Sequence, residues 1–140
     1  MTITELTQQD VESAYPALKE LRPDLTSAAD LAERFRVQSA QGYRLVASIV
    51  DGTAVAVAGF RAGNSLSRGA YLYIDDLSTL PQARRQGHAK ALLRWIDEEA
   101  ARLGVDQVHL DSGPQRHDAH RRYLTFGFDI AALHFSKKVG

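Results

Sequence analysis

The residues with the clearest chemical potential lie in residues 77–90, LSTLPQARRQGHAK, where a β-rich run ends and a strong helical pattern begins. The first backbone N–H groups of a helix have no intrahelical partners, and the helix dipole adds partial positive charge there. Gly87 and Ala89 carry minimal side chains, which lets a ligand approach the backbone. Arg84 and Arg85 add guanidinium groups that bind phosphate oxygens in pairs. The segment therefore predicts a phosphate or diphosphate site at the start of this helix.

Two adjacent acids and several histidines are the other candidates for chemistry. Asp75 and Asp76 stand at the end of a β-rich run, where acids are unusual unless they lie at a rim or face a ligand. The histidines are His88, His109, His117, His120 and His134. His117 and His120 share one helical face, but no third ligand has an obvious place beside them. We therefore predict no metal site.

Length, composition and charge narrow the class of protein. The chain has 140 residues and no repeat or Pro/Gly/Ser-rich linker, so we predict one domain over residues 1–140. It has no cysteine, which excludes disulfides, thiolate metal sites and cysteine nucleophiles. A formal net charge of zero argues against a nucleic-acid partner, and the apolar runs are too short to span a membrane. We expect a soluble, cytoplasmic protein that binds one small anionic ligand.

Hydrophobic periodicity and turn signals predict the elements that must position these residues. Asp51-Gly52 joins two β-rich runs and is a strong hairpin signal, because both residues tolerate positive φ. Ser27 followed by Asp30 is typical of a helix start. We predict strands at residues 2–5, 43–49, 53–60, 70–80, 107–111 and 128–138, a loop at 62–68, and helices at 8–21, from 27 onward, 87–103 and 117–126. The order β-α-α-β-β-β-α-β-α-β makes a mixed α/β domain.

The basic loop resembles the diphosphate loop of the GNAT acetyltransferase superfamily. That pattern is Arg or Gln, two residues, Gly, any residue, then Gly or Ala, and residues 84–89 read RRQGHA. Residues 77–81, LSTLP, look like the family's bulged fourth strand. The resemblance implies that the N–H of Leu77 faces the thioester carbonyl and that Thr79 bonds pantetheine through its backbone. It also implies that the diphosphate of coenzyme A is held by Arg84, Arg85, Gln86, Gly87, His88, Ala89 and Lys90.

A second match lies downstream. Residues 116–128, RHDAHRRYLTFGF, are similar to the family's Asn-x-x-Ala-x-x-x-Tyr-x-x-x-Gly-Phe segment, with Arg116 in place of the usual Asn. Tyr123 stands at the family's general-acid position. The resemblance implies a GNAT-type fold, which has a central mixed, mostly antiparallel sheet flanked by helices. It implies an acetyl-CoA-dependent N-acetyltransferase with acetyl-CoA as co-substrate.

In this family, acidic residues at the position of Asp75 and Asp76 often face the acceptor amine. Strand alternation predicts that the two side chains point apart, and we favour Asp75 as the one that faces the acceptor. An ordinary aspartate is about six pKa units too acidic to deprotonate an alkyl ammonium well, so we assign the acid to electrostatic anchoring. The expected reaction is direct attack of the amine on the thioester in a ternary complex, with Tyr123 protonating the thiolate.

Two rival functions and the identity of the acceptor stay open. A non-catalytic acyl-CoA-binding regulatory module would keep the same phosphate loop. A nucleotide enzyme could use the same helix terminus, but the Gly-x-x-x-x-Gly-Lys-Ser/Thr pattern of a P-loop is missing. The acceptor is a small-molecule or peptide amine, bound near the N-terminal helices and residues 62–68. A homodimer through a sheet edge is compatible with the sequence.

Overall fold

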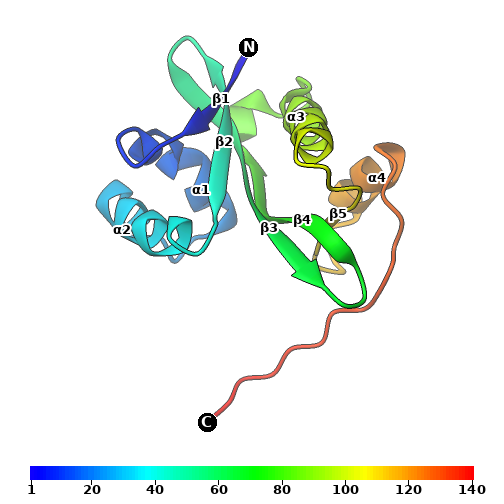
Figure 1. Cartoon of the computed structure of the whole chain (residues 1–140). Coiled ribbons are helices and arrows are strands. Elements are labelled where there is room, and N and C mark those ends of the chain that lie inside the picture. Colours follow the sequence, from blue (N-terminus) through cyan, green and yellow to red (C-terminus); the bar gives the residue numbers. More distant parts are fainter. The chain divides into compact units, whose positions relative to one another are not determined.

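The β-rich runs build one five-stranded mixed sheet whose spatial order follows the chain (Figure 1). The strands are β1 (Thr2–Leu6), β2 (Arg44–Val50), β3 (Thr53–Ser65), β4 (Gly69–Thr79) and β5 (Val108–Leu110). Each of the first four pairs antiparallel with its neighbour. The structure is a computed structural model that describes residues 1–140, and its contacts divide the chain into two compact units, Met1–His109 and Leu110–Gly140.

Helices cover both faces of the sheet in the first unit (Figure 1). They are the 3₁₀ turn η1 (Val11–Ala14), α1 (Tyr15–Leu21), α2 (Ala28–Ser39), the 3₁₀ turn η2 (Pro81–Ala83) and α3 (His88–Arg102). On the α1 side, the Ser78 hydroxyl donates to the Ala17 carbonyl at 2.7 Å. On the other side, Trp95 of α3 packs edge-on against Phe60 of β3. None of the helices has the length and hydrophobicity needed to cross a bilayer.

Local signals in the sequence account for most element boundaries. The Ser27 hydroxyl accepts from the Asp30 N–H at 3.0 Å and begins α2 as predicted. The β2–β3 hairpin turns at Asp51 and Gly52, whose φ values are 49° and 78°. The first predicted helix is divided into η1 and α1, because Pro16 has no N–H and fits only the first turn of an α-helix.

Two predicted segments differ from the structure. Residues 62–68 are not a loop, because β3 continues to Ser65 and pairs with the start of β4. Small residues in this segment are typical of a loop. In the structure, Gly63 instead makes room for the ring of Tyr71, which a Cβ at Gly63 would overlap. Residues 128–138 do not form the predicted last strand. Their hydrophobic alternation lacks a paired strand edge, and the apolar side chains of Ile130, Leu133 and Phe135 are exposed.

The second unit is built around α4 (His117–Thr125). The helix ends where Gly127 adopts φ 108°, and the Phe128 N–H donates to the Tyr123 carbonyl at 3.0 Å. Before the helix, an imidazole nitrogen of His120 lies 2.7 Å from the Gly113 carbonyl oxygen. The predicted helix at residues 117–126 is therefore confirmed, with its glycine stop.

Candidate active site

A β-bulge in β4 brings the two adjacent acids to one place. Gly59 faces Asp76 and Phe60 faces Ile74, so Asp75 is the extra residue in β4. The Asp75 carboxylate pairs with Arg61 at 2.8 Å, and the Arg61 guanidinium lies 5.4 Å from the Tyr43 ring. Tyr43 in turn contacts Asp76. The prediction that the two acids point apart is therefore wrong, because a bulge interrupts the alternation of side chains along a strand.

Tyr43 is the residue that organises Asp76, and the sequence motifs gave no sign of it. Its side chain is 6% exposed, and its hydroxyl donates to Asp76 Oδ2 at 2.7 Å. Burial, and then the neighbouring Asp76 carboxylate, raise the pKa of Tyr43 well above its ordinary value, so the phenol stays protonated and donates. Tyr43 reaches across β3 at Gly59, where any Cβ would overlap the phenol. An isolated glycine in a strand is the signal that could have indicated this close approach.

Asp76 also accepts a hydrogen bond from Arg22, which follows α1. Arg22 Nε lies 2.8 Å from Asp76 Oδ1, and Arg22 Nη2 donates to the Asp75 carbonyl at 2.8 Å. The Asp76 side chain is 14% exposed. Each carboxylate oxygen of Asp76 therefore has one protein donor, and each keeps a lone pair for a further partner.

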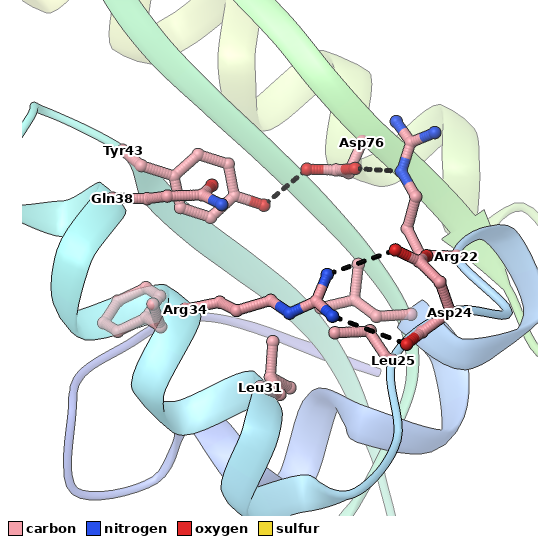
Figure 2. A pocket seen from close by; sticks show the side chains of 10 residues that line it. Arg22, Asp24, Leu25, Leu31, Arg34, Gln38, Tyr43 and Asp76 are labelled. Atoms are coloured by element: carbon pink, nitrogen blue, oxygen red, sulfur yellow. Dashed lines mark hydrogen bonds and ion pairs between the residues drawn. The ribbon is translucent and has the colours of Figure 1, made fainter.

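These residues border a pocket of about 230 Å³ between α1, α2 and the sheet (Figure 2). Figure 2 shows Asp76 held between the Tyr43 hydroxyl and Arg22, with Arg34 extended toward Asp24. The lining residues are Leu18, Arg22, Asp24, Leu25, Leu31, Arg34, Phe35, Gln38, Tyr43 and Asp76. Asp75, which the sequence argument favoured as the acceptor-facing acid, is not among them. The pocket thus combines an apolar wall with two cations and two anions.

Next to Asp76, β4 directs two backbone N–H groups away from β3. The Leu80 N–H donates to the Val55 carbonyl at 2.8 Å, which fixes the hydrogen-bonding side of this residue. Because alternate residues of a strand bond to the same side, the N–H groups of Leu77 and Thr79 face the opposite edge. The predicted backbone donors therefore lie on the edge of β4 away from β3, immediately after the residue that lines the pocket.

The loop before α3 has the features of an anion site. Gly87 caps the helix at φ 88° without a side-chain cap, and a Cβ there would meet nothing within 4 Å. The first N–H groups of α3 have no side-chain cap, and the backbone at Gly87 is open to approach. Arg85, with φ 63°, makes no ion pair, and Arg84 has only a 4.0 Å contact with Glu20. Two guanidinium groups and a helix N-terminus fit the diphosphate of a coenzyme A molecule.

The other residues predicted in this loop are arranged differently from one another. His88 is 4% exposed, and its Nδ1 lies 2.8 Å from the Ser48 hydroxyl oxygen inside the fold. Its ring is therefore absent from the basic cluster formed by Arg84 and Arg85. Gln86 donates from its side chain to the Gln82 carbonyl at 3.2 Å. Ala89 is buried and Lys90 is exposed on the first turn of α3.

Tyr123 lies on α4 in the second unit. Its ring packs edge-on against Phe128 at 6.0 Å, and no residue of Leu110–Gly140 forms a hydrogen bond with its hydroxyl. The local polar partner expected of a purely structural tyrosine is therefore missing. Its role as general acid stays a prediction. No group of three or more histidine, aspartate or glutamate side chains gathers as a metal site would require.

The chain is similar to known acetyltransferases. It matches the acetyltransferase (GNAT) family over residues 6–128. The uncharacterized N-acetyltransferase YhdJ of Bacillus subtilis (strain 168) is 34% identical over 134 residues, which cover 94% of each chain. The aminoalkylphosphonate N-acetyltransferase of Salmonella typhimurium is 38% identical over 64 residues, which cover 46% of this chain and 42% of that protein.

The fold is also found among solved structures. The aminoglycoside N-acetyltransferase AAC(6′)-Iy in complex with CoA has a TM-score of 0.84 at 19% identity, covering 98% of this chain and 93% of that one. At this identity the likeness concerns the fold, and it confirms the predicted GNAT-type architecture. The family match and the nearly full-length relative go further. The chain therefore belongs to the acetyltransferase (GNAT) family and is an N-acetyltransferase whose co-substrate is acetyl-CoA.

Proposed function

We propose that the pocket beside Asp76 binds a small primary amine and that the amine is acetylated where β4 passes from Asp76 to Leu77. One observation carries this proposal. Asp76 lines the pocket, and the next residue carries an N–H that points to the edge of β4 away from β3. A single step along one strand therefore joins an ammonium-binding carboxylate to a donor for the thioester carbonyl.

Acetyl-CoA would be held by the open edge of β4 and the start of α3. Arg84 and Arg85 supply the guanidinium groups for the diphosphate, and the N–H groups of residues 86–90 supply backbone donors. Thr79 would bond pantetheine through its backbone. Leu77 would stabilise the transition state, because its N–H would donate to the thioester carbonyl oxygen as negative charge develops there.

Asp76 is suited to anchor the acceptor more than to deprotonate it. Its oxygens already accept from Arg22 and Tyr43, and this fixes the carboxylate in one orientation. The remaining lone pairs can accept from an ammonium group in the pocket. The ammonium then loses its proton to water before attack. This proposal replaces Asp75, whose carboxylate is paired with Arg61, as the acid that faces the acceptor.

The chemical step needs one donor at Leu77 and one proton for the leaving group. The amine nitrogen forms a C–N bond to the acetyl carbon while the C–S bond breaks. The departing thiolate takes a proton, for which we propose Tyr123 as the source, and the acetylated nitrogen loses its second proton to solvent. A tyrosine near pKa 10 and a thiol near 8.5 differ by about 2 kcal/mol, a gap that a hydrogen bond strengthening with charge can offset.

Pocket size and charge support a small acceptor. A volume of about 230 Å³ suits a molecule of a few carbon atoms better than an oligosaccharide. The two arginines and two aspartates of the lining cancel, so a polycation would find no excess of negative charge. The relative from Salmonella, which by its name acetylates aminoalkylphosphonates, is consistent with an acceptor of this size.

A thiol-release assay with acetyl-CoA and a panel of amines tests the proposal. We expect turnover with small primary amines, and we expect Asp76→Asn to lower kcat/KM for the amine at least about tenfold. Asp75→Asn is the matched control, and it should change kcat/KM less than about threefold because its carboxylate does not line the pocket. Binding of acetyl-CoA without turnover of any amine would contradict the proposed reaction.

A further inference from the structure

We infer that Arg22 selects acceptors in which an acid group lies a few bonds from the amine, so that the substrate is a small zwitterion. This inference rests on the proposed function and names the class of acceptor. It begins from a difference between the two arginines of the pocket. One of them has a terminal nitrogen without a protein partner, and in the other every nitrogen has a partner.

Arg22 is held rigidly and still has a free donor. Its Nε is bonded to Asp76 and its Nη2 to the Asp75 carbonyl, each at 2.8 Å. No protein atom accepts from Nη1. The side chain lines the pocket and is 49% exposed. A guanidinium fixed on one side with an open donor on the other is ready to bind an anion.

Arg34 is more fully bonded, with a protein partner at every nitrogen. Its Nε donates to Asp30 at 3.2 Å and its Nη1 to Asp24 at 3.2 Å. Its Nη2 contacts both the Asp24 carbonyl and the Asp30 carboxylate, at 3.4 and 3.1 Å. All three nitrogens are therefore engaged with the protein. Arg34 is bound to α2 and the loop before it, and Arg22 is the pocket cation with a whole terminal nitrogen left for a ligand.

The charges of the Arg22–Asp76 pair are complementary to those of a zwitterion. A carboxylate and a guanidinium lie 2.8 Å apart at the same end of the pocket. An ammonium on Asp76 and an acid group on Arg22 Nη1 would lie a few bonds apart in a bound ligand. Leu18 and Leu25 also line the pocket, so it offers apolar surface for the methylene groups between the two charges. An uncharged amine would leave the Arg22 donor unused.

The test compares two acceptors that differ only in the acid group. β-Alanine carries a carboxylate where β-alaninamide carries a neutral amide of the same shape. We expect the wild type to show kcat/KM at least about tenfold higher for β-alanine, after correction of each rate to its free-amine fraction. Taurine and 2-aminoethylphosphonate replace the carboxylate by sulfonate and phosphonate, and their rates show which acid Arg22 prefers.

Arg22→Gln should bring the ratio of the two kcat/KM values close to one and leave the Kd for acetyl-CoA unchanged. Arg61→Gln is the matched control, because Arg61 pairs with Asp75 as Arg22 pairs with Asp76 but does not line the pocket. It should keep the wild-type ratio. Arg22→Lys retains the charge with fewer donors, so it should keep part of the preference for β-alanine. It replaces Arg22→Gln in the test if that variant does not fold.

The outcomes separate the inference from the proposed function. Equal or better turnover of β-alaninamide by the wild type would overturn the inference and leave the N-acetylation of small amines intact. An Arg22→Gln enzyme with an undiminished preference would also overturn it, since the acid group would then be bound elsewhere. If no amine of either class is acetylated while acetyl-CoA binds, the proposed function itself fails.

Discussion

Tyr43 shows how one hydroxyl can set the orientation of an acid that it does not neighbour in the chain. Its hydrogen bond to Asp76 is 2.7 Å long, and its raised pKa keeps it a donor across the working pH range. We predict that Tyr43→Phe raises the amine KM about tenfold, because a hydrogen bond to a charged group is worth about 1.5–3 kcal/mol. Steady-state kinetics with a saturating concentration of acetyl-CoA measures this effect.

The control for this prediction is Tyr15→Phe. Tyr15 also packs against the core of the first unit, but its hydroxyl has no protein partner and it does not line the pocket. The amine KM of Tyr15→Phe should stay within about twofold of the wild type. Equal KM values for the Tyr43 and Tyr15 variants would mean that the Tyr43 hydroxyl does not position Asp76.

The proposed role of Tyr123 is to protonate the leaving thiolate, so it is tested by reaction rates. If its hydroxyl protonates the leaving thiolate, it acts mainly in the transition state. Tyr123→Phe should then lower kcat at least about tenfold, since general acid catalysis contributes about 10²–10⁴-fold and water can substitute in part. The Kd for acetyl-CoA should change little. Single-turnover rates are the decisive measurement. If Tyr123→Phe shows the wild-type rate, another donor protonates the thiolate.

At the scale of the element, β3 contains two glycines that each make room for a tyrosine. A Cβ at Gly59 would overlap Tyr43, and a Cβ at Gly63 would overlap Tyr71. Both Gly→Ala variants should lose stability by about 1–3 kcal/mol through overpacking. Only Gly59→Ala should raise the amine KM, because Tyr43 donates a hydrogen bond to Asp76 and Tyr71 does not. Thermal denaturation and amine kinetics on the two variants check this. A similar amine KM for both variants would mean that Gly59 has no effect on amine binding through Tyr43.

The start of α3 carries the prediction for acetyl-CoA. Arg84→Ala with Arg85→Ala should weaken acetyl-CoA binding by at least about tenfold, since each charge-assisted hydrogen bond to phosphate is worth about 1.5–3 kcal/mol. Arg94→Ala removes an exposed, unpaired cation from the same helix and should leave the affinity unchanged. Titration calorimetry measures both. Unchanged affinity in the double variant would mean that this loop does not bind the diphosphate of acetyl-CoA.

The elements themselves could largely be predicted because their signals are local. The cap at Ser27, the turn at Asp51-Gly52 and the stripe of α3 each depend on residues within a few positions of one another. The bulge at Asp75 could not be placed in this way. It depends on the register between β3 and β4, which the residues of β4 alone do not specify. The direction of the two acids was therefore predicted wrongly.

The same distinction holds for the site. The loop of residues 84–89 could be predicted because a contiguous motif carries the anion-binding function. The acceptor pocket could not, because its residues come from α1, the segment after it, α2, the residue before β2, and β4. Arg22 and Asp76 are 54 positions apart in the chain and meet only in the folded structure. Side-chain contacts of this range leave no periodic pattern in the sequence.

At the scale of the whole molecule, a chain of ion pairs joins three elements of the first unit. Arg44 of β2 contacts Glu5 of β1 at 2.7 Å and Glu99 of α3 at 2.5 Å. Glu99, which is 7% exposed, also pairs with Arg102 at 2.5 Å. This network ties α3, the helix that begins at the predicted diphosphate loop, to β1 and β2. Removing Arg44 or Arg102 would leave the buried Glu99 carboxylate with a single partner, which is destabilising.

The network makes stability depend on pH through Glu99. The hydrogen bond from Arg102, followed by those from Arg44, holds the pKa of Glu99 at about 2, below its ordinary value of 4.5. A carboxyl whose pKa falls on folding contributes stability above its unfolded pKa and loses it as pH falls through the folded pKa. The contribution should therefore be complete above about pH 5, decline between about pH 4.5 and 2, and vanish below.

Glu99→Gln isolates this contribution, because a glutamine resembles the protonated carboxyl. We predict that the variant is less stable than the wild type by about 1–3 kcal/mol at pH 7, and that the gap narrows steadily below about pH 4.5. Urea denaturation at pH 7, 4 and 3 measures the gap. Glu98→Gln is the control, because Glu98 is exposed on the same helix without an ion pair, and its stability should follow the wild type at each pH. A gap for Glu99→Gln that stays constant with pH would assign the loss to packing and not to charge.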